Sequence, residues 1–569
     1  MYVASLLPFY VRHIGWLPLF LLVGSISFAQ SDNVALDSMG ANINRKNWKE
    51  AIKWAIKDGE DHPADKYWRY LNAAEFASLD KDTSLALHYT SLVAASDIAT
   101  NAYFNANFDW LRDDPRWKAL MTQIDQAIEQ QKQERIRASL PFRKEQKRLL
   151  AQADQERAIV ANGLSAEQLY QQLRQTRPLR SYSSTERYQY AWLSYKDSLE
   201  VPYMIQLPAN FDPRKDYPLV VVLHGAVSQQ SSFPDVADST TTTGFFGASF
   251  VEQARQSDII AVFPYGTRQY NWMQPDAGFD LVPKVIRQVK QMYPIADNRV
   301  YITGHSNGAT GAFSYLMKEP SLFAGFSGIN NRPQVRTGGT FLRNGGNRSF
   351  HNVATDYDYY FPLEGHRSVT ALANQLGMDW SNQEVIGKRD HSYLMFSQDS
   401  SVKSVYQQLF ANMLAKQRNP FANQLYWECD DVQHGRCDWL EIAGLDTLST
   451  KANWHQSTNV SVRSWRSVED PSVLLDSSSR AFVFPRRSGA VQASYSNNVF
   501  RLTTSHVNLI RLYLSPEMVD FKRPIRVLVN NKTVYSGLVH LDKEYLLTTY
   551  QREGDRQAVW ANHLVLKVK

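Results

Sequence analysis

The sequence has few cysteines, little net charge and no long apolar run after its first thirty residues. Only two cysteines occur among 569 residues, which excludes a small disulfide-rich scaffold. The net charge is +6, and lysine and arginine are mixed with acidic residues, so no basic block indicates a nucleic-acid partner. No later run is long and apolar enough for a transmembrane helix. A chain of this length exceeds one hydrophobic core and predicts several domains.

The first thirty residues resemble a targeting segment. Arg12 and His13 precede the apolar run "IGWLPLFLLVGSISFA", and Ser27 and Ala29 are the small residues expected before a cleavage site. We expect residues 1–29 to be a signal peptide, and the mature protein to be secreted or periplasmic with no transmembrane span. An uncleaved anchor is the alternative.

Export gives the two cysteines a structural meaning. Cys429 and Cys437 flank a polar turn that contains Gly435. Two strands folding back about that turn would bring the thiols together, and an oxidising compartment would let them bond. A metal site needs more ligands than this pair and His434 supply. We therefore expect a Cys429–Cys437 disulfide, and no metal.

The ends of the chain differ in texture from its middle. Residues 30–126 have the apolar spacing of short helices, and a weak repeat near the tetratricopeptide period predicts a TPR-like domain. That domain is either a protein-binding surface or a helical cap. Residues 127–185 are rich in Gln, Arg, Glu and Lys and predict a charged, solvated helical linker. Residues 419–569 alternate with period two and predict an antiparallel β domain.

Residues 186–418 alternate between strand and helix patterns. "YPLVVVLHG" and "DIIAVFPYG" are continuous apolar runs typical of strands buried on both faces. Helical segments such as "DLVPKVIRQVKQMY" separate them. This order predicts an α/β domain with a mostly parallel sheet flanked by helices.

Within this region "RVYITGHSNGATGAF" predicts a nucleophile. A strand leads into Gly304-His305-Ser306-Asn307-Gly308, and small helix-compatible residues follow. Such a turn exposes the serine oxygen at the carboxyl edge of the sheet. The five-residue pattern also occurs by chance, and the strand and helix around it are what favour a nucleophile.

A serine nucleophile needs a base and an acid that orients it, each after a later strand. Asp358 is the preferred acid and Asp356 the alternative, and His391 is the preferred base. His351 precedes the acid and His366 lies on the helix after it, so neither fits the order as well.

The same mechanism needs two backbone N–H groups that bind the oxyanion. Asn307 follows the nucleophile and supplies the first. The early strand-end "VVVLHGAVSQQ" supplies the second, from Gly225 or Ala226. His224 lies too early to be the base, and we expect it to shape this loop.

Together "YPLVVVLHG", "YPIADNRVYITGHSNGATGAF", "DYYFPLEGHR" and "DHSYLMF" resemble the α/β-hydrolase superfamily. Within it they are similar to exported esterases of the poly(3-hydroxybutyrate) depolymerase and feruloyl esterase type. The resemblance covers roughly residues 186–415 and implies ester hydrolysis with Ser306, Asp358 and His391 in the catalytic positions. Many members have a second glycine after the elbow, where this chain has Ala309. The tail resembles a β domain that accompanies such hydrolases.

We therefore expect an exported serine esterase that needs no cofactor and acts on an ester-bearing small molecule or polymer. Two alternatives stay open: a serine peptidase of the prolyl-oligopeptidase type, and a non-catalytic scaffold built on a hydrolase core. The peptidases usually carry a β-propeller, and the helical N-terminal region argues against one. The complete Ser/Asp/His set argues against a scaffold.

Overall fold

The computed structural model describes residues 34–61, 66–95, 106–160, 163–177, 189–196, 199–227, 248–273, 278–358, 360–396, 400–466 and 473–568. The predicted signal peptide lies outside these ranges. The chain divides into two compact units, residues 1–138 and 139–569. No helix in the described ranges is long and apolar enough to cross a membrane.

The first unit is helical. Its elements are α2 (Val34–Asn44), α3 (Trp48–Asp61), α4 (Lys66–Leu79), α5 (Thr83–Ala94), the 3₁₀ turn η2 (Ala106–Leu111) and the first part of α6 (Pro115–Val160). Small residues such as Ala51, Ala55 and Ala77 are fully buried where the helices meet, which allows close approach of the backbones. Asp82 caps α5 by accepting the Leu85 N–H at 3.0 Å. The tetratricopeptide assignment stays a prediction.

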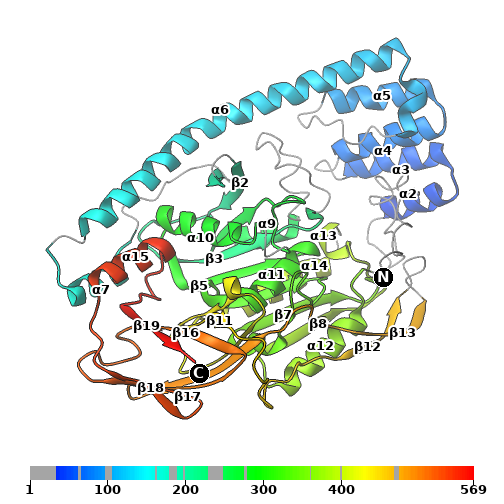
Figure 1. Cartoon of the computed structure of the whole chain (residues 1–569). Coiled ribbons are helices and arrows are strands. Elements are labelled where there is room, and N and C mark those ends of the chain that lie inside the picture. The colour runs from blue at the N-terminus through cyan, green and yellow to red at the C-terminus, as the bar shows by residue number, and fades with distance from the viewer. Residues whose placement is uncertain are drawn as a thin grey trace, which may run out of the picture. The chain divides into compact units, whose positions relative to one another are not determined.

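The second unit contains the predicted α/β region, drawn mainly in green in Figure 1. Its strands are β1 (Gln189–Tyr195), β2 (Leu199–Gln206), β3 (Tyr217–Leu223), β4 (Ile260–Pro264), β5 (Ile295–Gly304), β6 (Gly325–Ile329), β7 (Ser349–Thr355) and β8 (Trp380–Val385). Within the described residues they form one eight-stranded sheet in the order β1-β2-β4-β3-β5-β6-β7-β8.

The sheet is mixed, whereas the sequence predicts a mostly parallel one. β2 runs antiparallel to both β1 and β4, and the pairs from β4 to β8 are parallel. This strand order, with the Ser306 turn after β5, is the α/β-hydrolase fold. Because parallel strands end at the same edge, the turns after β3, β5, β6, β7 and β8 meet there.

Helices cover both faces of this sheet. They are α9 (Ala248–Gln256), α10 (Leu281–Met292), α11 (Asn307–Lys318), α12 (Leu363–Gln375), α13 (Tyr393–Phe396) and α14 (Ser400–Leu414), with 3₁₀ turns η4 (Pro320–Leu322) and η5 (Leu342–Asn347). All seven residues of β3 are buried. Val221 packs with α10, α11 and α12 in one core, and Val220 packs with α9, α13 and α14 in another. Alternate side chains of one apolar strand thus supply both cores.

The remaining chain of this unit is mostly β-structure. Its elements are β9 (Gln424–Cys429), η6 (Val432–His434), β10 (Arg436–Cys437), β11 (Leu440–Leu445), β12 (Ser461–Arg466), β13 (Leu474–Arg480), β14 (Gly489–Ser496), β15 (Val499–Ser505), β16 (Val507–Leu514), β17 (Ile525–Val529), β18 (Lys532–Gly537), α15 (Lys543–Glu553) and β19 (Asn562–Lys567). Among the described strands, β18-β17-β15-β14-β9 and β10-β11-β16-β19 form two sheets that share one core. The region is not wholly antiparallel, because β15 and β17 are parallel.

The predicted linker is not a wholly solvated helix: Phe142 and Leu149 of α6 are buried in the core of the α/β region, and its last helix docks on the β region. Helix α7 (Ala166–Gln175) begins with a capping box between Ser165 and Gln168. Leu169, Tyr170 and Leu173 lie on one of its faces and are buried in the core of the β region. Three apolar residues at helical spacing within a polar segment thus give this helix a face that packs on the β region.

The predicted disulfide is wrong: Cys429 and Cys437 are both buried, free thiols. Cys429 ends β9 and pairs with Gly489 in the five-stranded sheet. Cys437 lies in β10 and pairs with Leu440 in the four-stranded sheet. The turn between them carries the chain from one sheet to the other instead of closing a hairpin. Burial raises the pKa of Cys429 to about 12.

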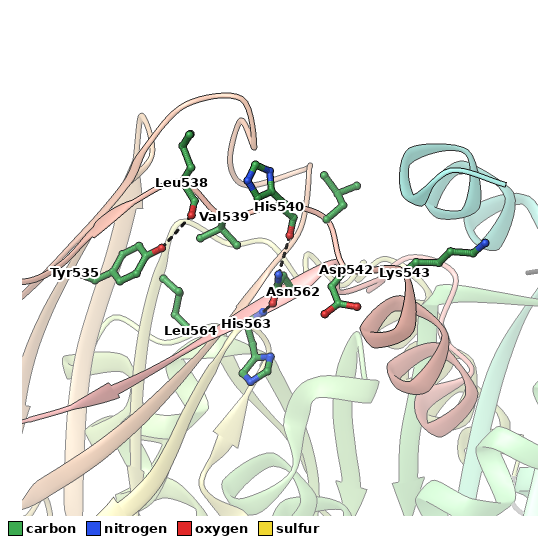
Figure 2. A pocket seen from close by; sticks show the side chains of 10 residues that line it. Tyr535, Leu538, Val539, His540, Asp542, Lys543, Asn562, His563 and Leu564 are labelled. Atoms are coloured by element: carbon green, nitrogen blue, oxygen red, sulfur yellow. Dashed lines mark hydrogen bonds between the residues drawn. The ribbon is translucent and has the colours of Figure 1, made fainter.

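A hollow of about 530 Å³ lies between two open sheet edges of the β region. Figure 2 shows Tyr535 of β18 on one side and Asn562, His563 and Leu564 of β19 on the other. The connecting segment, residues 538–543, closes one end. None of the predicted catalytic residues lines it.

Candidate active site

Ser306 occupies a strained turn between β5 and α11. Its backbone angles are φ 57° and ψ −119°, a region that non-glycine residues occupy at a cost of about 1–3 kcal/mol. Its N–H donates to the Ile329 carbonyl at 3.0 Å, which ties the turn to the end of β6. A Cβ at Gly308 would overlap the Leu223 carbonyl oxygen, so only glycine lets α11 begin this close to β3.

Ala309, the departure from the family pattern, fits because β6 has a glycine opposite it. A Cβ at Gly328 would lie 2.7 Å from the Ala309 Cβ. Gly328 on the neighbouring strand thus leaves room for the Ala309 methyl group, so a second glycine after the elbow is not needed.

Asp358 and His391 are in direct contact at the same edge of the sheet. His391 Nδ1 lies 2.7 Å from Asp358 Oδ2. Asp358 is fully buried, and its Oδ1 accepts the N–H groups of Tyr360 and Phe361, both at 2.9 Å. These contacts hold the carboxylate group in place beside the imidazole. A carboxylate fixes the proton on Nδ1, which leaves Nε2 free to act as a base.

Asp356, the alternative acid, has a different set of contacts. Its carboxylate accepts the N–H groups of Gly387, Lys388 and Arg389 at 3.1, 3.1 and 2.8 Å. It therefore joins the turn after β7 to the segment that leads to His391. Of the two aspartates, only Asp358 contacts the imidazole within the described part of the chain.

His305 and Asn330 hold the backbone of His391. The His391 carbonyl accepts His305 Nε2–H at 2.8 Å and Asn330 Nδ2–H at 3.0 Å. Asn330 Oδ1 in turn accepts the N–H of Thr355 at 2.9 Å. Burial, followed by the neighbouring His391, lowers the pKa of His305 to about 3, so this imidazole stays neutral and donates from Nε2.

Ser306 follows His305 in the chain, and the His305 ring lies beside that of His391. The rings of His305 and His391 lie 4.7 Å apart between centroids. In the described ranges no hydrogen bond joins the Ser306 hydroxyl to His391. Such contacts often tighten only when substrate binds. The structure therefore brings Asp358 and His391 together and places Ser306 on the adjoining turn.

The predicted oxyanion donors lie beside the serine. A Cβ at Gly225 would lie 3.2 Å from the Ser306 Cβ, and Ala226 has a positive φ of 52°. Asn307 is the first residue of α11, where helical N–H groups have no partner within the helix. The end of β3 and the start of α11 thus both lie next to Ser306.

His224 fixes the loop that carries Gly225. Its Nδ1 donates to the Gly225 carbonyl at 2.7 Å, and its Nε2 accepts the Gly266 N–H at 2.9 Å. Burial lowers its pKa to about 4, which keeps the ring neutral. The ring lies edge-on to Trp272, with centroids 4.9 Å apart. Gly266 and Trp272 carry no recognisable motif, and the sequence analysis missed them.

The two competing histidines have other hydrogen-bond partners. His351 Nδ1 lies 2.8 Å from Ser381 Oγ, between β7 and β8. His366, in α12, has its Nδ1 3.0 Å from Asn352 Nδ2. Among the described residues no group of three or more His, Cys, Asp or Glu side chains is placed to hold a metal ion.

Comparisons with known proteins find similarity over part of the chain. Residues 198–358 match the family model Esterase, described as "Putative esterase". The chain is 22% identical to a thermostable esterase (TM-score 0.32), and the match covers 40% of this chain and 63% of that one. It is 13% identical to Thermogutta terrifontis esterase 2 phosphoramylated by tabun (TM-score 0.33), covering 42% and 99%. No curated protein matches it.

Proposed function

We propose that the protein is a serine hydrolase that cleaves carboxylic esters with Ser306, His391 and Asp358. The observation that carries the proposal is the shared sheet edge. At this edge lie a serine on a strained turn and a histidine whose Nδ1 is 2.7 Å from a buried aspartate. The match of residues 198–358 to an esterase family supports the ester as substrate.

In this mechanism Ser306 Oγ attacks the ester carbonyl while His391 Nε2 takes its proton. The carbonyl oxygen becomes an oxyanion beside the N–H groups of Asn307 and of Gly225 or Ala226. His391 then gives the proton to the leaving alkoxide, which forms the alcohol and the acyl-serine. Water then attacks the acyl-serine in the same way, with His391 as the base. This step releases the carboxylic acid and frees Ser306. Asp358 holds the imidazole and stabilises its positive charge throughout.

A fluorophosphonate probe tests the nucleophile, because it forms a bond only with an activated serine. We expect wild type to be labelled, and Ser306→Ala to be unlabelled while keeping the wild-type unfolding midpoint. A matched control, Ser314→Ala, removes a hydroxyl on the same helix that bonds to the Thr310 carbonyl. Absence of label on wild type, or label on Ser306→Ala, would refute the assignment.

The finer identity follows the resemblance to exported esterases. We propose a polyester or a carbohydrate-linked ester as substrate, cleavage of the signal peptide after Ala29, and a protein partner for the helical unit. Hydrolysis of p-nitrophenyl esters with no release from matched peptide anilides separates this proposal from a peptidase. Preferential cleavage of the anilides would favour the peptidase alternative.

A further inference from the structure

A rigid loop after β6, residues 330–340, passes the nucleophile turn. Its start is fixed where the Arg332 N–H donates to Thr310 Oγ1 at 3.1 Å, within the first turns of α11. Its middle is fixed where the Val335 N–H donates to Thr340 Oγ1 at 2.9 Å. Its end is fixed where the Gly339 N–H donates to Asp430 Oδ2 at 2.8 Å. The loop therefore begins next to the site, since Ile329 accepts the Ser306 N–H and Asn330 donates to the His391 carbonyl.

Two arginines of this loop have no acidic partner. Arg332 and Arg336 are four residues apart, and neither makes an ion pair or a side-chain hydrogen bond to any described residue. Asp430, the carboxylate that anchors the loop, is already matched by Lys318 at 2.9 Å and Arg486 at 3.3 Å. Most other arginines of this unit are paired, as Arg348 is with Asp438.

The two guanidinium groups are close enough to repel each other. Burial, and next the charge of Arg336, lower the pKa of Arg332. The beginning of α11 adds positive potential next to them, because helical N–H groups point out of that end. Asp358, the predicted acid of the site, already has His391 and two backbone N–H donors. Within the described part of the chain, no ion pair compensates the charge of these two arginines.

Asn331, between Asn330 and Arg332, is an independent indication of a missing partner. It is fully buried, and neither its Oδ1 nor its Nδ2 has a hydrogen-bond partner in the part of the chain that the structure describes. A buried amide without partners costs about 1–3 kcal/mol. The start of this loop thus holds a polar group whose partners the described residues do not supply.

We propose that the ester substrate is anionic, and that Arg332 and Arg336 bind its acid group beside the scissile bond. This inference rests on the proposed function. Guanidinium groups bind carboxylate and sulfonate-type anions with paired N–H donors. Because the loop backbone is anchored at three points, little backbone freedom is lost on binding.

Matched ester pairs test the proposal. On the acyl side, mono-p-nitrophenyl adipate is compared with p-nitrophenyl hexanoate. On the alcohol side, para-carboxyphenyl and para-sulfophenyl butyrate are compared with para-carbamoylphenyl butyrate. We expect wild-type kcat/KM to be about tenfold higher for the anionic member of one pair, a difference of about 1.4 kcal/mol. The preference should weaken as NaCl is raised, because salt screens exposed charges.

Arg332→Gln and Arg336→Gln should each lower kcat/KM for the anionic ester by about tenfold, mainly through KM. Hydrolysis of the neutral partner should stay within about twofold of wild type, which also shows that the variants fold. Arg526→Gln, on β17, is the control for loss of one exposed arginine and should leave the preference unchanged. Equal rates for both members of every pair, or equal losses on neutral and anionic esters, would overturn the anion site. Failure of the proposed function is distinct, since then no ester is hydrolysed and Ser306 is not labelled.

Discussion

Two aspartates two residues apart have different tasks because of the groups they meet. Asp358 is buried against the His391 imidazole. Asp356 accepts three backbone N–H groups from the neighbouring turn. Asp358 can therefore stabilise a positive charge on the imidazole, whereas Asp356 can only stabilise the conformation of the loop.

Asp358→Asn should therefore lower kcat on a short p-nitrophenyl ester by about 10³–10⁴-fold, since an amide does not hold the required tautomer or stabilise the imidazolium. Asp356→Asn keeps one oxygen acceptor and should lower kcat by less than about tenfold while lowering the unfolding midpoint. Steady-state kinetics and denaturant unfolding of both variants measure these effects. A larger loss of kcat in Asp356→Asn would reverse the two roles.

At this scale the sequence predicts the candidate residues better than their contacts. The order Ser306, Asp358, His391 follows from motif and topology, and the structure places Asp358 and His391 together. The choice between Asp356 and Asp358 depends on the direction in which each side chain points from the turn after β7. Sequence spacing does not encode that direction. His305 and Asn330 both donate to the His391 carbonyl. These hydrogen bonds join segments far apart in the chain, so no local pattern predicts them.

At the scale of elements, the start of α11 is packed against the end of β3. Gly225 adjoins Ser306, and a methyl group there would lie 3.2 Å from the Ser306 Cβ and 3.3 Å from the His305 carbonyl oxygen. Neither neighbour is the flexible end of a long side chain, so the strand-end loop itself would have to move.

Gly225→Ala should displace the oxyanion donors and lower kcat by about 10²-fold, close to the loss of one donor. Gly365→Ala in α12 is the matched control, because a Cβ there meets no atom within 4 Å. That control should keep kcat and gain up to about 1 kcal/mol of stability, as glycine is a poor helix residue. Equal kcat in the two variants would remove this loop from the oxyanion site.

The sequence predicts an element well where the pattern within one strand identifies it. It predicts poorly which strands pair with each other and in which direction. The apolar run at β3 identifies a buried strand without its neighbours. The parallel pairing of β15 with β17 is invisible in the period-two pattern, because alternation is the same for either direction. Cys429 and Cys437 show the same limit: eight residues apart in sequence, they belong to different sheets.

At the scale of the whole second unit, buried ion pairs join the α/β region to the β region. Lys318 pairs with Asp430, Arg348 with Asp438, and Arg418 with Asp555, at 2.9, 2.6 and 2.8 Å, and each side chain is at most 5% exposed. The sequence boundary at residue 418 thus separates charges that neutralise each other. Residues 139–569 form one compact unit, and we expect neither region to fold well without the other.

Arg348→Met tests this coupling because it leaves Asp438 buried without its cation. We expect a loss of about 3–5 kcal/mol in the free energy of unfolding, measured by denaturant titration. Adding Asp438→Asn should recover part of it, and asparagine suits the positive φ of 49° at that position. Arg367→Met, which breaks an exposed pair with Glu384, should cost at most about 1 kcal/mol. Similar losses in the buried and exposed variants would contradict the coupling.

The two free thiols give the protein a built-in reporter of its own opening. Cys429 and Cys437 are the only cysteines of the chain, and both are at most 1% exposed. An alkylating reagent can reach them only when the two sheets of the β region separate. Its rate of incorporation therefore follows how often that separation occurs, with no engineered probe. Because the buried ion pairs tie these sheets to the α/β region, the same rate would also register a loosening of the catalytic half.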